Sequence, residues 1–119
     1  MEKKSKKLLE HKILSKEKLL KKIGPFPRKE KVLVCHGTFD IVHPGHIRHL
    51  MHAKTQCQKL VVSITGDKHI FKTNYRPFVP EDMRAFNLAA LEIVDYVVID
   101  ENDKPIELIE FLKPDFFAK

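Results

Sequence analysis

Short apolar runs alternate with amphipathic stretches along most of the chain. Four runs are rich in β-branched or aromatic residues, as is typical of strands buried on both faces. They cover residues 32–35, 60–64, 96–99 and 116–118. Because helical patterns separate these runs and no hairpin signal lies between them, the pattern predicts right-handed crossovers and a parallel sheet.

Three helices are expected between these strands. They cover residues 44–56, residue 81 to about residue 93, and residues 105–112. Pro44 stands near the first position of the first helix, where its missing N–H costs nothing. Residues 66–80 have no periodic segment and contain two prolines, so we expect an ordered loop or a flap there.

The N-terminal residues follow a different pattern. Leucines and isoleucines recur every three to five residues as far as Ile23, which predicts one or two short amphipathic helices. Ser15 is suited to cap the second of them, and Gly24 followed by Pro25 ends the pattern. We therefore divide the chain into a lysine-rich helical extension and linker, residues 1–29, and a domain, residues 30–119.

The net charge of +6 is not spread over the domain. Residues 1–22 hold nine lysines and three glutamates, whereas the other residues of the 119 hold 13 basic and 13 acidic side chains. This basic segment contains neither arginine nor an aromatic residue, which stacking on bases would favour. We therefore expect a solvated extension rather than a nucleic-acid partner.

The composition also excludes several classes of protein. No run of about 18 apolar residues exists that could span a membrane, and the charged N-terminus lacks the apolar stretch of a secretory signal. Cys35 and Cys57 are the two cysteines and cannot form a disulfide scaffold. We expect a cytoplasmic protein without a membrane partner.

The segment between the first strand and the first helix carries the candidate chemistry. It lies at the carboxyl edge of the sheet, where open α/β sheets bind ligands, and a helix N-terminus attracts phosphate. Gly37 and Gly45 remove side chains where a phosphate would approach the backbone. His43 and His46 flank Gly45 and can direct N–H donors into one small volume, which a transferring phosphoryl group requires.

The histidines at positions 43, 46, 49 and 52 also raise the question of a metal site. A step of three residues covers about 300° on a helix, so the four side chains cannot share one ion. No cysteine or carboxylate completes a recognised zinc spacing. We predict no metal ligands here, place His49 and His52 at the surface, and leave the role of His36 open.

The same segment resembles a known family. It reads Gly37-Thr38-Phe39-Asp40 and then His43-Pro44-Gly45-His46. This resembles the HxGH motif of the nucleotidylyltransferase superfamily, in particular glycerol-3-phosphate cytidylyltransferases and the adenylyltransferase domains of ADP-heptose synthases. Further similar segments are Val61 to Asp67, Arg76-Pro77 and Glu81 to Arg84. The expected fold is then α/β and Rossmann-like, with a parallel sheet of about four strands in the order 3-2-1-4 and flanking helices.

The resemblance implies transfer of CMP or AMP from CTP or ATP to a small phosphorylated alcohol or sugar. Pyrophosphate is released, and Mg²⁺ bridges the triphosphate. By this resemblance the catalytic residues are His43, His46 and Lys72, and the residues around the nucleotide phosphates are Gly37, Thr38, Phe39, Asp40 and Gly45. Asp40 would hold the loop or its helix in position, while Asp67 and Arg76 are candidates for the acceptor side. Relatives of this type commonly form homodimers, and the neutral domain surface permits one.

One departure from the family pattern leaves an alternative open. Related enzymes carry a later Ser/Thr-rich motif preceded by an arginine, and nothing like it appears before Lys119. We therefore expect a domain truncated at its C-terminus, and a longer form with more activity. The alternative is a non-catalytic nucleotide-binding or interaction module of the same fold. No residue here distinguishes CTP from ATP or identifies the acceptor.

Overall fold

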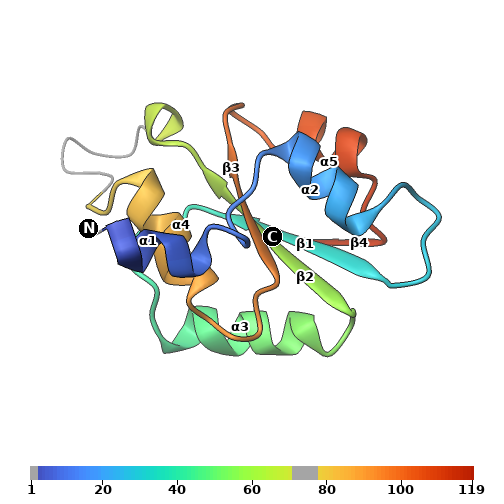
Figure 1. The fold of residues 1–119 in the computed structure, drawn as a ribbon, viewed down its shortest axis with the longest axis horizontal. Coiled ribbons are helices and arrows are strands. Elements are labelled where there is room, and N and C mark those ends of the chain that lie inside the picture. The colour runs from blue at the N-terminus through green and yellow to red at the C-terminus, as the bar shows by residue number, and fades with distance from the viewer. Residues whose placement is uncertain (1–2, 71–77) are drawn as a thin grey trace.

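The computed structural model describes residues 3–70 and 78–119. In this part of the chain four strands form one parallel sheet in the order β3-β2-β1-β4 (Figure 1). The strands are β1 (Val32–Gly37), β2 (Lys59–Thr65), β3 (Tyr96–Asp100) and β4 (Phe116–Ala118). The predicted order 3-2-1-4 is confirmed. The first three strands run one or two residues past their predicted carboxyl ends, so His36, Thr65 and Asp100 belong to the sheet.

The predicted helices are present but shorter. They are α3 (Pro44–Lys54), α4 (Glu81–Ala89) and α5 (Ile106–Leu112), and a 3-10 turn, η1, covers Asp67–His69. Helix α4 ends four residues before the predicted position. At this end, Lys12 Nζ donates to the carbonyls of Ala89 at 3.0 Å and Leu91 at 3.2 Å and stabilises the turn that follows.

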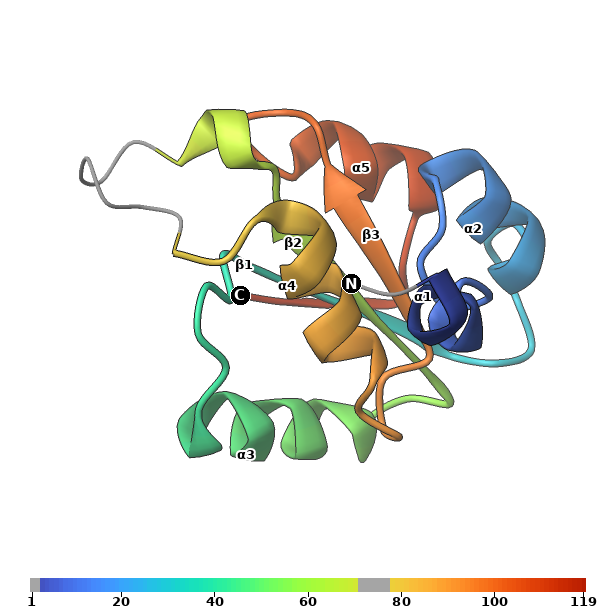
Figure 2. The same ribbon diagram turned by 60° about the vertical axis from the view of Figure 1, so that its left-hand side comes forward.

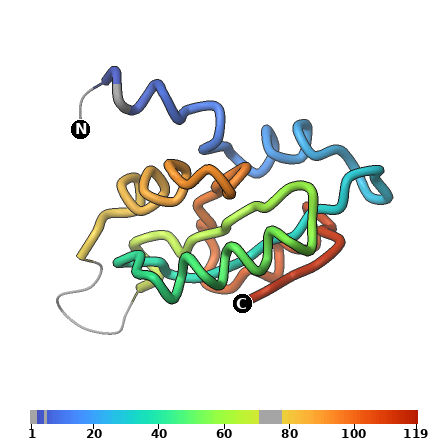
Figure 3. The backbone as a smooth tube through the Cα atoms, turned by 90° about the horizontal axis from the view of Figure 1, so that it is seen from below, coloured from blue at the N-terminus to red at the C-terminus, as the bar shows by residue number. Residues whose placement is uncertain are grey.

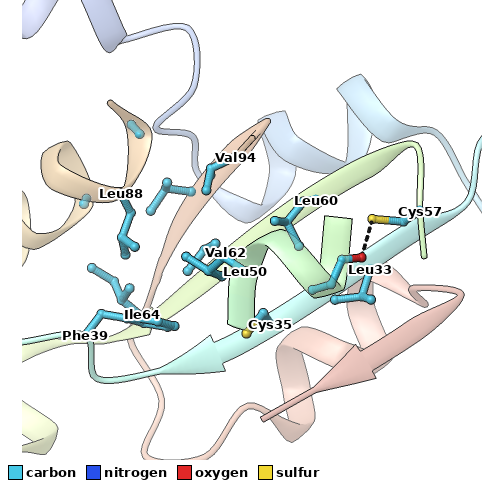
Figure 4. Close-up of a cluster of buried hydrophobic side chains, with 14 residues drawn as sticks. Leu33, Cys35, Phe39, Leu50, Cys57, Leu60, Val62, Ile64, Leu88 and Val94 are labelled. Carbon is cyan, nitrogen blue, oxygen red and sulfur yellow. Dashed lines mark hydrogen bonds between the residues drawn. The ribbon is translucent and has the colours of Figure 1, made fainter. Parts of the chain in front are cut away.

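Helices cover both faces of the sheet, α3 and α4 on one and α2 (Lys16–Ile23) and α5 on the other (Figure 2). Seen from below, α3 runs in front of the strands (Figure 3). One apolar cluster lies between the sheet and α3 and α4, where Leu50 packs beside Val62 (Figure 4). A second lies under α2 and α5. The central strands are therefore apolar on both faces, as parallel strands require.

The N-terminal residues pack on this domain. Helices α1 (Lys3–Leu9) and α2 confirm the two predicted helices, and Ser15 caps α2 by accepting the N–H of Lys18 at 3.2 Å. Between them, Lys12 to Leu14 pair with β3: Leu14 donates to the Val97 carbonyl at 3.0 Å, and the Val97 N–H donates to Lys12 at 2.8 Å. Leu19 is completely buried. The apolar side chains of this segment therefore pack on the domain while its lysines stay mostly exposed, and a domain boundary at residue 29 stays a prediction.

Candidate active site

The two predicted histidines lie together at the start of α3. His43 is the N-cap residue of the helix and His46 follows one turn later. Their ring centroids are 3.9 Å apart, and the ring planes are inclined by 33°. Both side chains line a pocket of about 390 Å³ at the carboxyl edge of the sheet. The structure thus brings together the pair that the sequence singled out.

Hydrogen bonds fix the protonated nitrogen of each ring. Nδ1 of His43 accepts the backbone N–H of Gly45 at 3.0 Å, and Nδ1 of His46 accepts the backbone N–H of His43 at 3.2 Å. A neutral imidazole whose Nδ1 accepts must carry its proton on Nε2. Each ring therefore carries its N–H on Nε2, and that of His46 is partly satisfied by the Ile41 backbone, whose hydrogen bond raises the pKa of the ring. The N–H of Gly45 is already used, so the side chains rather than that amide supply donors here.

His46 is held in its neutral form. Burial lowers the pKa of His46, the neighbouring His43 and His49 lower it further, and a hydrogen bond with the Ile41 backbone acts in the opposite direction. A neutral imidazole can donate a hydrogen bond without carrying a full positive charge. His46 is therefore suited to interact with charge that develops on a substrate oxygen during reaction.

The neighbouring rings leave no room for a side chain at the two glycines of the motif. A Cβ on Gly37 would lie 2.8 Å from the Phe39 ring, and a Cβ on Gly45 would lie 2.8 Å from the His43 ring. The structure thus gives a packing reason for both glycines, and the predicted one, room for a phosphate, stays a prediction. Gly45 allows His43 to reach back to the helix start, and Gly37 allows Phe39 to fold against β1.

Phe39 supports the histidine pair from behind. Its backbone adopts φ of 49°, a left-handed conformation that costs energy for a residue with a side chain. This turns the ring inward, where it is buried in the first apolar cluster and lies 5.3 Å from the His46 ring. The side chain of Phe39 therefore packs in the core, and Phe39 also lines the pocket together with Thr38.

The Asp40 side chain binds backbone N–H groups of the protein. Its buried carboxylate accepts the N–H groups of Phe78 at 3.0 Å and Val79 at 2.8 Å. These residues lead from the 66–80 segment into α4. Because a carboxylate repels phosphate and this one is committed to two amides, Asp40 acts as a positioning residue for that connection.

Arg84 links the same segments from the interior of the protein. Its role was not predicted from the sequence. It is completely buried in α4, and its guanidinium donates to four oxygens. These are the carbonyls of Thr38 (2.8 Å), Thr65 (2.8 Å) and Val79 (2.9 Å) and the carboxylate of Asp67 (2.6 Å). The available signal was its place on the apolar face of α4, one helical turn before Leu88.

Of the two candidates for the acceptor side, only Asp67 lies among the described residues. The Asp67 carboxylate binds Arg84 and also accepts the N–H of Glu81 at 3.2 Å, while Glu81 accepts the N–H of Asp67 at 2.8 Å. Asp67 therefore links β2 to α4. Lys72 and Arg76 lie outside the described residues, so their roles stay predictions.

Within residues 3–70 and 78–119, no group of three or more His, Cys, Asp or Glu side chains could hold a metal ion. His49 and His52 are exposed, as predicted. In the same part of the chain, no helix is long and apolar enough to cross a membrane.

Comparison with known proteins gives relatives over most of the chain. The bifunctional protein HldE of Helicobacter pylori is 44% identical over 110 residues, which are 91% of this chain and 23% of the relative. The protein of the same name from Campylobacter jejuni is 44% identical over 112 residues, 92% of this chain and 24% of the relative. The chain thus spans about a quarter of the length of these curated relatives.

A solved structure and a family description agree with the fold. The crystal structure of the lipopolysaccharide core biosynthesis protein from Thermoplasma volcanium is similar with a TM-score of 0.68 and 26% identity. The match covers 74% of this chain and 72% of that one. Residues 34–119 match the family described as cytidylyltransferase-like. This range contains both histidines of the pair and the whole sheet apart from the first two residues of β1. The resemblance seen in the sequence is therefore confirmed, and the chain belongs to the cytidylyltransferase-like family.

Proposed function

We propose that the chain catalyses nucleotidyl transfer, moving CMP or AMP from CTP or ATP to a small phosphate monoester. The family supports this reaction class, and the pair formed by His43 and His46 carries the proposal. Two imidazoles with their N–H groups on Nε2 share one pocket at the carboxyl edge of the sheet. A transfer reaction needs donors of this kind, fixed before the substrate arrives.

The reaction requires no covalent intermediate with the protein. An oxygen of the acceptor phosphate attacks the α-phosphorus of the triphosphate and forms a new P–O bond. The bond between the α-phosphorus and the oxygen that bridges to the β-phosphate breaks, and pyrophosphate leaves with that electron pair. Negative charge increases on the oxygens around the α-phosphorus and on the leaving group, where the two Nε2–H donors would bind.

The remaining expectations stay predictions. Mg²⁺ would enter with the triphosphate, held by phosphate oxygens and water, as an ion that keeps much of its hydration prefers. Asp40 and Asp67 are committed to protein partners, so we derive no step through a protein-held metal. Lys72 and Arg76 would add positive charge. A homodimer and a cytoplasmic location belong to the same proposal.

The test is pyrophosphate release. The protein is incubated with MgCTP or MgATP and a panel of phosphate monoesters, and His46→Ala is compared with wild type. Removing one positioned donor lowers turnover on the order of 10²–10³-fold. The matched control is His52→Ala, which removes an exposed histidine from the last turn of the same helix and leaves turnover unchanged.

Two results would contradict the proposal. Turnover of His46→Ala within a few-fold of wild type would remove the histidine pair from catalysis. Nucleotide binding without turnover for any acceptor, measured by calorimetry alongside the assay, would favour the non-catalytic binding module.

A further inference from the structure

One peptide group of the motif loop is held from the interior of the protein by Arg84. The completely buried guanidinium of Arg84 donates to the Thr38 carbonyl at 2.8 Å. The same guanidinium binds the carboxyl end of β2, where it donates to the Thr65 carbonyl at 2.8 Å and to the Asp67 carboxylate at 2.6 Å. The Thr38 carbonyl is therefore tied to the end of the neighbouring strand.

The contact at Thr38 sets the direction of the Phe39 N–H. The peptide bond between these two residues is trans, and in a trans peptide the carbonyl and the following N–H point in opposite directions. Because the carbonyl points to the buried Arg84, the Phe39 N–H points away from it. Within residues 3–70 and 78–119, no hydrogen-bond acceptor is found for this N–H. The loop thus carries an unused donor on the side opposite Arg84.

The same loop forms a wall of the candidate active site. Thr38, Phe39 and His46 line the pocket of the histidine pair, and the same three residues line a smaller neighbouring pocket of about 220 Å³. The two pockets therefore share this wall. An unused backbone N–H in the wall can bind an anion that enters either pocket.

The conformation of Phe39 leaves this N–H little freedom. Its φ of 49° is left-handed, and such a conformation persists only where the surroundings determine it. Arg84 holds the peptide group before Phe39, and the first apolar cluster holds the ring after it (Figure 4). The donor is therefore fixed before a substrate arrives, which is the condition under which a hydrogen bond stabilises developing charge most effectively.

Arg84 also strengthens the donor. Hydrogen bonds in a chain polarise one another, so a cation at the carbonyl oxygen makes the N–H of the same peptide group a better donor. The interior of the protein screens this charge much less than water does. Asp67 offsets part of it, but the Asp67 side chain is 40% exposed whereas that of Arg84 is completely buried. Positive charge is therefore passed through the peptide group to the Phe39 N–H.

We propose that Arg84 is a positioning residue for the transfer reaction, because its contact with the Thr38 carbonyl directs the Phe39 N–H at a phosphate oxygen of the nucleotide. The inference rests on the proposed function. It adds to the site a residue 38 positions after His46, on another helix. The resemblance placed Phe39 near the nucleotide phosphates, and the structure supplies the donor atom and the residue that directs it. Arg84 itself touches no substrate.

The variant Arg84→Lys tests the positioning in the transfer assay. Lysine keeps the charge, but one ammonium group cannot hold Thr38, Thr65 and Asp67 together. Loss of one directed donor lowers kcat on the order of 10²-fold. The KM of the nucleotide stays within about threefold, because the lost interaction is strongest in the transition state. The matched control is Arg48→Lys, at an exposed arginine of α3, which leaves both constants unchanged.

A merely structural role gives a different result. The folded fraction of each variant is measured by circular dichroism at the assay temperature, and kcat is expressed per folded molecule. If Arg84 only stabilises the fold, Arg84→Lys lowers the folded fraction and leaves kcat per folded molecule equal to that of wild type. This outcome would overturn the inference.

NMR of the backbone amide protons detects the donor without turnover. When MgCTP or MgATP is added to wild type, the Phe39 amide proton moves downfield, and in Arg84→Lys this shift is lost. Gly45 is the internal control, because its N–H is already donated to His43 Nδ1 at 3.0 Å and its signal moves less. A Phe39 signal that stays in place while calorimetry shows nucleotide binding overturns the inference.

The two measurements separate this inference from the proposed function. A Phe39 shift that depends on Arg84, without pyrophosphate release from any nucleotide, rejects the transfer reaction and keeps the positioning role. Pyrophosphate release with an unmoved Phe39 signal does the reverse, and failure of wild type to bind either nucleotide overturns both. If Arg84→Lys does not fold, the guanidinium signals of Arg84 in wild type decide. They shift with nucleotide if the peptide group couples the two, and unmoved signals overturn the inference.

Discussion

The ring of His46 accepts the backbone N–H of His43 at 3.2 Å while the two rings stack 3.9 Å apart. The same two side chains therefore start helix α3 and line the pocket. In most helices Ser, Thr, Asp or Asn performs the capping role. Here the caps orient the groups that the proposed reaction uses, so folding of the helix start and assembly of the site are one event.

We expect the folded state to lose stability in mildly acidic solution, before the carboxyl groups titrate. The pKa values of His46 and His36 are lowered from 6.5, so the unfolded chain binds protons more readily than the folded one. The stability that these groups contribute is complete above 6.5 and is lost as the pH falls below it. We expect a lower urea midpoint at about pH 5.5 than at about pH 7.5. NMR titration of both rings at or above 6.5 would contradict this.

Replacement of Asp40 tests the link between the motif and the connection into α4. Asp40→Asn keeps one acceptor oxygen but turns an amide N–H₂ toward the second backbone N–H. We expect a loss of about 1–3 kcal/mol in the free energy of unfolding, from a charged hydrogen bond removed in a buried place. Urea denaturation measures it, and faster proteolysis next to Phe78 is a second readout. Asp103→Asn, at an exposed aspartate, is the control; equal stability of the two variants would refute the role.

Arg84→Met should be among the most destabilising single substitutions. It leaves three carbonyl groups and the half-exposed Asp67 carboxylate without their shared donor, and each buried acceptor left without a donor costs about 1–3 kcal/mol. Arg84→Lys should recover part of this, because lysine can reach Asp67 but cannot hold the fork of contacts. Arg48→Met, at an exposed arginine of α3, is the control for urea denaturation. An Arg84→Met protein as stable as this control would show that the guanidinium contacts contribute nothing.

Leu19→Ala tests whether the N-terminal helices belong to the folded unit. The side chain is completely buried in the cluster under α5, so truncation should cost about 2–5 kcal/mol. Leu8→Ala, at a leucine that is 74% exposed, should change stability by less than about 0.5 kcal/mol. Identical urea midpoints for the two variants would mean that α2 can detach without unfolding the sheet.

Much of the fold could be predicted because its strands are buried on both faces. Such strands leave continuous apolar runs, and the helices between them leave periodic ones, so the element types and a parallel sheet followed from the pattern, whereas the strand order followed from the family resemblance. The end of α4 could not be found in the same way. Its last carbonyl is bound by Lys12, which lies 77 residues away from Ala89 in the chain, and no local pattern predicts that contact.

The residues of the candidate site could also be predicted only in part. His43 and His46 could be identified because the motif is local and its two side chains meet across one helical turn. Arg84 could not be assigned a role, because a buried charge is explained only by the partners that the fold brings to it. The packing of the basic N-terminal segment on the domain was missed for the same reason. Its charge was visible in the sequence, whereas the burial of Leu19 depends on α5.

The pairing of Lys12 and Leu14 with Val97 has a consequence for how the molecule behaves in a crowded solution. β3 is the last strand on its side of the sheet, and such a border offers unpaired N–H and carbonyl groups to any extended chain that meets it. The N-terminal segment satisfies some of these groups from within the same molecule. It therefore works as a built-in guard against intermolecular strand addition, and its removal should make the protein prone to aggregate.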